Sequence, residues 1–218
     1  MLEILDFVKE SLFMVLFVTF KINLLCDKKK KSKKKNIQTN ITVEAFLGKT
    51  HVENVICTNG KEFPADLVII GVGVLPNVEL AKEAGLDVEN GIIVDESCRT
   101  NDPDIVAAGD CCNHFNQHYQ RRIRLESVPN ASEQGKAAAA TICGVKKAYN
   151  ALPWFWSDQY DLKLQIAGLS QGYDQVVIRG NKQTSRSFAA FYFDKGQLIS
   201  AECVNRPKEF MLSKKIIS

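Results

Sequence analysis

A run of lysines divides this chain before any folded element can be assigned. Residues 28–35 contain seven lysines in eight positions. Charge of one sign at that density cannot be buried, so the fold has to be built from residues on either side of the run. Without these lysines the chain has 21 Lys and Arg against 25 Asp and Glu, a net charge of −4 instead of +3. The basic balance therefore belongs to a solvated linker, and we expect no nucleic-acid binding.

The segment before the lysines is apolar but short. Residues 12–20 form an apolar run of only nine residues with charged residues close on both sides. A membrane-spanning helix needs about 20 apolar residues, so we do not expect a membrane protein. Two alternatives stay open: a weak membrane tether through residues 1–26, or a segment of residues 1–37 that is not native to the fold.

Seven cysteines are scattered along the chain without a framework spacing and without a Cys-x-x-Cys motif. This usage predicts reduced thiols in a cytoplasmic protein, with no metal site. We interpret the adjacent Cys111 and Cys112 as two small residues beside a buried turn, not as a redox pair.

From residue 40 the sequence predicts short alternating elements. Periodicity and turn residues favour strands at 41–46, 51–58, 67–70, 91–94 and 105–108, and helices at 78–84 and 132–143, the latter with Asn130 and Glu133 as a cap-like pair. Beyond Pro153 we expect strands at 162–169, 175–179, 187–193 and 198–204, and then a helix at 208–217. The fold class is therefore α/β followed by a small α+β region.

Two stretches could carry chemistry. The apolar segment before Gly109 and Asp110 predicts a strand end, where Gly109 lets a ligand approach the backbone and Asp110 can accept hydrogen bonds from hydroxyl groups. Residues 124–134 lead into an alanine-rich helix, whose N-terminal N–H groups suit a flavin ring that gains negative charge on reduction. A capped turn and an ordinary surface helix are the alternatives.

These stretches together resemble the C-terminal half of the ferredoxin–NAD(P) reductase family, of the putidaredoxin and rubredoxin reductase type. The resemblance covers residues 40–218 and rests on five motifs in order: residues 71–77 (GVGVLPN), 100–110 (TNDPDIVAAGD), 124–134 (RLESVPNASEQ), 153–160 (PWFWSDQY) and 204–210 (VNRPKEF). It implies a partial flavoprotein fold with two dinucleotide-binding domains, followed by a small C-terminal α+β interface domain. The implied domains are residues 38–76 (part of the NAD-binding domain), 77–152 (part of the FAD-binding domain) and 153–218.

The resemblance also implies roles for individual residues. Asp110, next to Gly109, would hold the ribityl chain of FAD, and the backbone N–H of Val128 would meet the flavin ring. Glu126 would lie by the nicotinamide pocket, and Trp154 and Trp156 would lie near the flavin and the docking face. The implied function is transfer of electrons from NAD(P)H through FAD to a ferredoxin-type iron–sulfur protein, with a homodimer possible.

The aromatic and basic residues of these motifs have plainer alternatives. Trp154 and Trp156 could be core, and Arg121, Arg122 and Arg124 a solvated loop, although the arginines would also attract an acidic ferredoxin. No histidine precedes a proline, as it does in the disulfide reductases of the superfamily, so the resemblance implies direct hydride transfer and no catalytic acid or base.

The sequence departs from the family in one important respect. It has neither of the two Gly-x-Gly-x-x-Gly motifs that bring a dinucleotide pyrophosphate to a helix N-terminus. We therefore expect the chain alone to bind FAD weakly or not at all. A non-catalytic interaction module that keeps only a partner surface is the alternative function.

Overall fold

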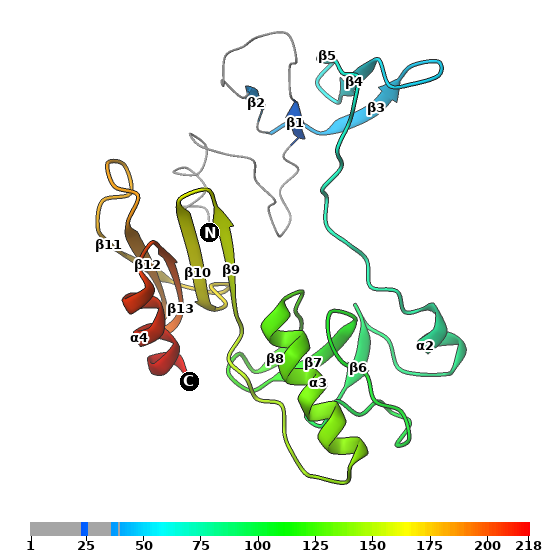
Figure 1. Ribbon diagram of the computed structural model, residues 1–218, viewed down its shortest axis with the longest axis vertical. Helices are drawn as coiled ribbons and strands as arrows, with labels where there is room; N and C mark the ends of the chain where they lie inside the picture. Colours follow the sequence, from blue (N-terminus) through cyan, green and yellow to red (C-terminus); the bar gives the residue numbers. More distant parts are fainter. Residues whose placement is uncertain (1–22, 26–35, 39) are drawn as a thin grey trace. The chain divides into compact units, whose positions relative to one another are not determined.

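The structure is a computed structural model that describes residues 23–25, 36–38 and 40–218 (Figure 1). The apolar run at 12–20 and the lysines at 28–35, with the tether and foreign-segment interpretations, lie outside the described residues. The described chain divides into two compact units, and the boundary along the sequence lies between Val74 and Leu75. Each unit is described by itself.

The first unit contains small antiparallel sheets. Its main sheet confirms the expected hairpin and continues through a turn at Asn59-Gly60, where Gly60 adopts a φ of +77° and its N–H donates to the carbonyl of Cys57 at 2.9 Å. A separate two-stranded pair lies earlier in the chain. The strands are β1 (Asn23–Leu25), β2 (Asn36–Gln38), β3 (Val43–Leu47), β4 (Asn54–Cys57) and β5 (Glu62–Pro64).

The buried strand expected at residues 67–70 is wrong. These residues have no regular secondary structure, and Leu67, Ile69 and Ile70 are 71%, 83% and 64% exposed. An apolar strand of this kind is stable only between neighbouring strands, and no strand of the described chain pairs with it. Residues 67–70 therefore do not form the strand that their sequence favours.

The first part of the second unit is a three-stranded mixed sheet with two helices. Strand β7 pairs parallel with β6 and antiparallel with β8, in the order β6–β7–β8. The expected strand at 105–108 is wrong, because only Val106 forms a bridge, to Arg99. Hydrogen-bonded turns on both sides of this bridge, at Asp95 and Asp102, stop the pairing from extending. The elements are α2 (Glu79–Glu83), β6 (Ile92–Val94), β7 (Cys112–Asn116), β8 (Arg121–Arg124) and α3 (Val128–Ile142).

Helix α3 begins four residues earlier than its sequence suggests. Ser127 is the N-cap, and its hydroxyl oxygen accepts a hydrogen bond from the N–H of Asn130 at 3.4 Å. Pro129 occupies the first turn, where its missing N–H costs no intrahelical bond. The expected cap at Asn130 and Glu133 is therefore wrong. The expected stop is confirmed, because Gly144 has a φ of +73° just beyond the helix.

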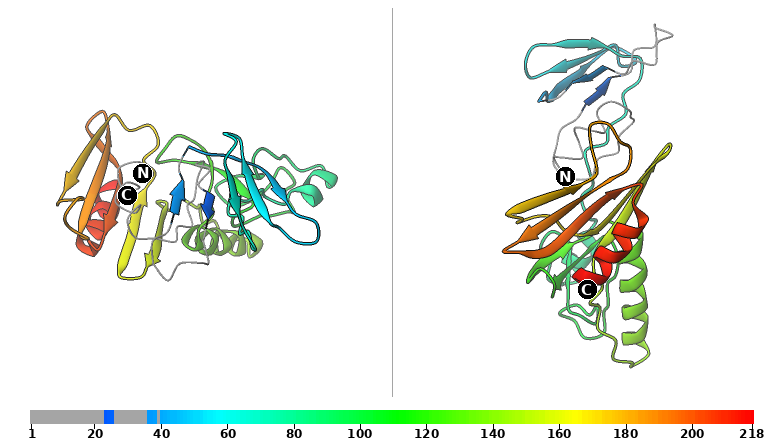
Figure 2. Two further views of the ribbon diagram at one scale, coloured as in Figure 1. Left: turned by 90° about the horizontal axis from the view of Figure 1, so that it is seen from above. Right: turned by 90° about the vertical axis from the view of Figure 1, so that its left-hand side faces the viewer.

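The C-terminal part is a five-stranded antiparallel sheet covered by one helix. The strand order is β11–β12–β13–β10–β9, and helix α4 packs against β13 and β10 (Figure 2). Its core is built of small residues around one aromatic side chain: Ala167, Ala189, Ala201, Cys203 and Phe210. The four expected strands and the helix are confirmed, and β9 is an addition. The elements are β9 (Trp154–Gln159), β10 (Leu162–Gly168), β11 (Gln175–Arg179), β12 (Phe188–Asp194), β13 (Gln197–Val204) and α4 (Pro207–Ile217).

One tyrosine ties the mixed sheet to the C-terminal sheet. The hydroxyl of Tyr119, in the loop between β7 and β8, donates to the carbonyl of Ile199 at 2.9 Å and accepts from the N–H of Leu169 at 2.7 Å. Burial raises the pKa of Tyr119, so the hydroxyl stays protonated as this donor role requires. Among the residues that the structure describes, no helix is long and apolar enough to cross a membrane.

Candidate functional site

The candidate site lies where helix α3 begins beside the loop at Gly109 and Asp110. Gln134 joins the two, since its side-chain oxygen accepts a hydrogen bond from the N–H of Gly109 at 2.7 Å. Gln134 is completely buried. The loop therefore has a fixed position relative to the first turns of α3, although it follows a single bridge and not the strand end that we expected.

Gly109 is buried at this loop and has a left-handed backbone conformation. Its φ is +92°, a conformation that side chains rarely adopt. A Cβ built there would meet only the Cβ of Ala131, at 3.8 Å. The backbone conformation, and not a lack of space, therefore favours glycine here.

Asp110 is exposed, and its carboxylate has no hydrogen bond or ion pair to any residue in the described part of the chain. Its backbone carbonyl, by contrast, accepts a hydrogen bond from Nη1 of Arg124 at 3.0 Å. The backbone is therefore held while the carboxylate stays available to hydroxyl donors from outside the chain.

Glu126 is already paired. Its carboxylate lies 2.7 Å from Nη1 of Arg124, and both side chains are largely buried, with 22% and 11% exposed. Arg124 thus links Glu126 to the backbone of Asp110. It lies in strand β8, so the interpretation of Arg121, Arg122 and Arg124 as a loop is wrong.

Val128 is the first residue of α3, and its side chain is 69% exposed. The first N–H groups of a helix have no intrahelical acceptor. Within the described residues nothing accepts a hydrogen bond from the Val128 N–H, whereas Asn130 is served by Ser127. The N–H of Val128 can therefore donate to a ligand at the positive end of the helix.

A buried polar network supports the helix from behind. Nε2 of Gln134 lies 3.1 Å from Nδ1 of His114, whose ring meets that of Tyr149 edge-on with centroids 4.9 Å apart. The hydroxyl of Tyr149 donates to the side-chain oxygen of Asn130 at 2.7 Å, and Asn130 donates to the carbonyl of Leu125 at 3.1 Å. Residues from β7, α3 and the segment after α3 therefore fix one helix end.

The titration of His114 follows from its burial. Burial, with a smaller contribution from the positive charge of Arg122, lowers the pKa of His114 to about 4. The imidazole is therefore neutral near pH 7. Gln134 donates to Nδ1, which leaves the proton on Nε2, and Nε2 finds no acceptor among the described residues.

The two tryptophans lie in β9, which contacts α3. Their ring centroids are 5.6 Å apart, and Trp154 also packs on Phe210 and under the ammonium group of Lys214, 4.4 Å from its ring centroid. Trp154 is therefore part of the C-terminal packing, as its plainer alternative predicted. Trp156 is 45% exposed and presents aromatic surface.

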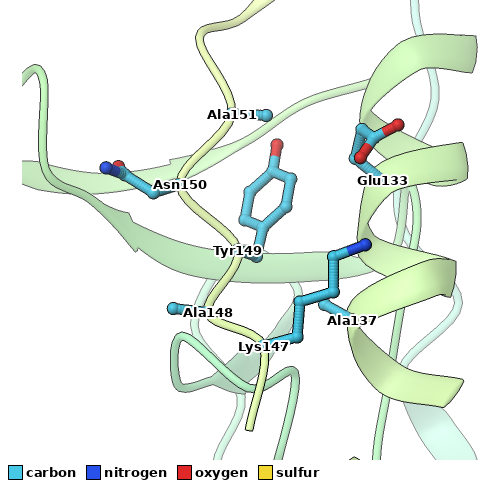
Figure 3. Close-up of a pocket in the computed structure, with 7 residues that line it drawn as sticks. All are labelled: Glu133, Ala137, Lys147, Ala148, Tyr149, Asn150 and Ala151. Carbon is cyan, nitrogen blue, oxygen red and sulfur yellow. The ribbon is translucent and has the colours of Figure 1, made fainter. Parts of the chain in front are cut away.

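A hollow lies between α3 and the segment after it. Figure 3 shows Tyr149 facing the helix, with Glu133 and Ala137 across from it. The hollow has a volume of about 240 Å³, which is smaller than the roughly 300–1,000 Å³ of typical ligand pockets. The carboxylate of Glu133 forms an ion pair with Nζ of Lys136 at 2.6 Å, and this ion pair lowers the pKa of the carboxyl. We assign no ligand to this hollow.

Sequence reasoning did not find the residues that hold the site together. Gln134 appeared only as a letter of a motif, Arg124 was considered only for its charge, and Asn130 was taken for a cap. The available signal was a glutamine among the alanines of a helix that packs on a core. A buried side-chain amide needs hydrogen-bond partners, so this residue indicated contacts with other segments. Whether Gly109, Asp110, Glu126, Val128 and Trp156 bind a cofactor stays a prediction.

Comparison with known proteins decides the family. The pattern described as "Pyridine nucleotide-disulphide oxidoreductase" matches residues 17–135, more than half of the chain. The chain belongs to the pyridine nucleotide-disulphide oxidoreductase family. A second pattern, "Reductase C-terminal", matches residues 154–218. The first match includes residues 17–37, which the sequence alone did not connect with the family.

Relatives of this family member confirm the resemblance to ferredoxin reductases. The chain is 48% identical over 167 residues to putidaredoxin reductase of Pseudomonas putida, covering 77% of this chain and 39% of the relative. It is 40% identical over 197 residues to a ferredoxin–NAD(P)(+) reductase of a Sphingomonas species, covering 88% and 47%. The reductase in a solved covalent putidaredoxin reductase–putidaredoxin complex superposes with a TM-score of 0.78 at 46% identity, over 83% of this chain and 44% of that one. The fold class is thereby confirmed, and the chain spans less than half the length of these relatives.

Proposed function

We propose that this chain forms part of an FAD-dependent oxidoreductase that passes electrons from NAD(P)H to a ferredoxin-type iron–sulfur protein. The observation that carries the proposal is the fixed pair formed by the Gly109–Asp110 loop and the start of α3, held by Gln134. Within the proposed enzyme, residues 38–76 belong to the NAD-binding domain, 77–152 to the FAD-binding domain and 153–218 to the interface domain.

The residues of the loop fit the sugar-like part of FAD. Gly109 carries no side chain that would stand between a ligand and the backbone, and the unpaired carboxylate of Asp110 can accept hydrogen bonds from ribityl hydroxyl groups. Arg124 keeps the Asp110 backbone in place through its carbonyl. Asp110 would therefore act as a binding residue.

The start of α3 fits the polar edge of the flavin ring. The Val128 N–H would donate to a ring carbonyl, and the partial positive charge of the helix end would stabilise a negatively charged ring. The redox chemistry, hydride uptake and single-electron release, would be supplied by FAD when it is bound, and the residues here would hold and orient it. The buried network behind α3 keeps the donor in position, and Arg124 holds the Glu126 carboxylate at the side of the site.

The acceptor surface is proposed on strand β8 and strand β9. Arg122 is exposed on β8, and Trp156 on β9 presents an aromatic ring. Both features suit an acidic electron-transfer partner, because positive charge speeds encounter and an exposed aromatic ring supplies contact area. The similarity to a reductase solved with its iron–sulfur partner supports this class of acceptor.

The test compares the chain alone with the chain plus the N-terminal half of a related ferredoxin reductase, which carries two glycine motifs. We expect FAD-dependent reduction of a ferredoxin by NADH or NADPH only in the mixture. Asp110→Ala should lower the activity of the mixture by raising the FAD concentration it needs. Asp104→Ala, which removes another exposed aspartate of the same segment, should leave it unchanged.

A different result would favour the alternative function. Two outcomes contradict the proposal: a folded chain that gives no activity in the mixture, or equal behaviour of Asp110→Ala and Asp104→Ala. A ferredoxin that still binds the inactive chain would then indicate an interaction module. The missing Gly-x-Gly-x-x-Gly motifs are the observation that keeps this alternative in the experiment.

A further inference from the structure

Two thiols lie side by side directly after the proposed binding loop. The Sγ atoms of Cys111 and Cys112 are 3.8 Å apart. Cys112 is completely buried at the start of β7, whereas Cys111 is half-buried and reachable from solvent. Neither thiol is used by the proposed function.

The separation of the sulfurs favours a bridge by one atom over a direct bond. At this separation the two sulfurs are in van der Waals contact, and a small side-chain rotation lets one inserted atom bond to both. A disulfide needs about 2.05 Å and usually Cα atoms at least about 4.4 Å apart, whereas adjacent residues on a trans peptide have theirs only about 3.8 Å apart. The pair is therefore close enough to share one inserted atom, whereas a direct bond would strain the backbone.

The surroundings decide which atom that can be. In the described part of the chain, no third cysteine, histidine or carboxylate joins this pair to complete a metal-binding cluster. Zinc and similar ions take four ligands in protein sites of this type, so two sulfurs alone would leave such an ion incompletely bound. A trivalent organoarsenical requires two sulfurs and no further protein ligand.

We propose that Cys111 and Cys112 form a capture site for trivalent arsenicals. In the reaction with R–As=O, two As–S bonds form and the As=O bond breaks, and the two thiol protons leave with the oxygen as water. No atom changes its oxidation state. Burial raises the pKa of the Cys112 thiol, which keeps it protonated and makes it a weak target for direct oxidation.

The backbone around the pair is held in place before capture. The carbonyl of Cys111 accepts a hydrogen bond from the N–H of Ile92 at 2.7 Å, and the N–H of Cys112 donates to the carbonyl of Gly109 at 3.0 Å. The backbone that carries the two sulfurs therefore needs no rearrangement before capture, and the half-buried Cys111 is the sulfur that a reagent meets first. Preorganised chelation makes the second As–S bond an intramolecular step, which raises affinity without new contacts.

The test uses phenylarsine oxide on the reduced full chain, followed by intact-mass measurement after a challenge with excess monothiol. We expect one adduct per chain that resists the monothiol and is removed by a dithiol. Cys111→Ser should reduce retention by more than about tenfold, because a single remaining sulfur loses the chelate advantage. Circular dichroism and the melting temperature of Cys111→Ser should match those of the parent protein.

Two controls keep the result specific. Cys143→Ser removes the exposed cysteine at the C-cap of α3 and should leave the adduct intact. Cys26→Ser removes a cysteine outside the described residues and should also leave it intact. Full retention of the adduct in Cys111→Ser, or its loss in either control, would overturn the proposal.

Discussion

The side-chain oxygen of Gln134 accepts a hydrogen bond from the backbone N–H of Gly109 at 2.7 Å, across 25 residues of chain. The same amide contacts Nδ1 of His114, and the backbone carbonyl of Gln134 accepts a hydrogen bond from Sγ of Cys98 at 3.5 Å. One completely buried side chain thus joins helix α3, strand β7 and the proposed binding loop. Removing it should loosen all three.

The first prediction concerns Gln134→Leu. The substitution keeps the buried volume but leaves the Gly109 N–H and the His114 ring without their partner. Leaving a buried polar group unpaired costs about 1–3 kcal/mol, so we expect the free energy of unfolding to fall by that amount in urea titrations. Ser132→Ala, an exposed change in the same helix, should change it little. Equal stability of the Gln134→Leu and parent proteins would contradict the assigned role.

The second prediction concerns pH. The pKa of His114 is about 4 in the folded chain against an ordinary value of 6.5, so between these values the unfolded chain binds more protons than the folded chain. The stability associated with neutral His114 is fully present above pH 6.5 and is lost as the pH falls toward 4. A pKa difference of this size corresponds to a loss of about 3 kcal/mol in the free energy of unfolding.

The measurement is urea unfolding across that pH range in the parent protein and in His114→Phe. The phenyl ring keeps the edge-on contact with Tyr149 but cannot titrate. We expect the variant to lose most of the pH dependence, even though its stability at neutral pH is lower because Gln134 loses a partner. A variant with the same slope as the parent would show that other groups cause the acid sensitivity.

The third prediction concerns the junction between the two sheets of the second unit. Tyr119→Phe removes a hydroxyl that both donates to Ile199 and accepts from Leu169. We expect a loss of about 1–3 kcal/mol, because the Ile199 carbonyl and the Leu169 N–H both lose their partner. Faster proteolysis of the segment after α3 should accompany it. Tyr173→Phe, which removes the hydroxyl of a half-exposed ring packed on Tyr192, serves as the matched control.

The fourth prediction concerns FAD. The chain offers Asp110 and Val128 but has no Gly-x-Gly-x-x-Gly motif, so hydrogen bonds of about 0.5–3 kcal/mol each cannot offset the entropy of holding a large ligand. Protein mixed with FAD should emerge from a desalting column without visible flavin absorbance. A yellow protein after desalting would mean that other surfaces of this chain hold the diphosphate.

The sequence predicted those helices and strands whose own residues stabilise them, and missed those that depend on contacts with distant segments. The hairpin at β3 and β4, helix α3 and strands β10–β13 carry their own turn residues and periodicity, and all were predicted. Residues 67–70 have a strong preference for the strand conformation, but no strand of the described chain pairs with them. Local preference alone cannot provide a pairing partner. Strands β7 and β8 were missed because their sequences (CNHFN and RRIR) are polar, and their pairing comes from tertiary contacts.

The candidate site divides in the same way. Asp110 and Val128 could be named from motifs, and the structure adds that the carboxylate is free and that the N–H has no internal acceptor. The pairing of Glu126 with Arg124 and the reach of Gln134 to Gly109 depend on contacts between distant segments. No local pattern encodes such contacts, because they exist only once β8 and α3 lie beside the loop.

The unfulfilled strand at residues 67–70 has a practical consequence for handling the protein. It continues into Val72, Val74 and Leu75, which are 79%, 65% and 90% exposed, so a string of apolar side chains faces water. Uncharged segments of this kind pair edge to edge between molecules. The shelf life of the purified chain should therefore depend on protein concentration more than on temperature, and dilution or a mild detergent should keep it in solution.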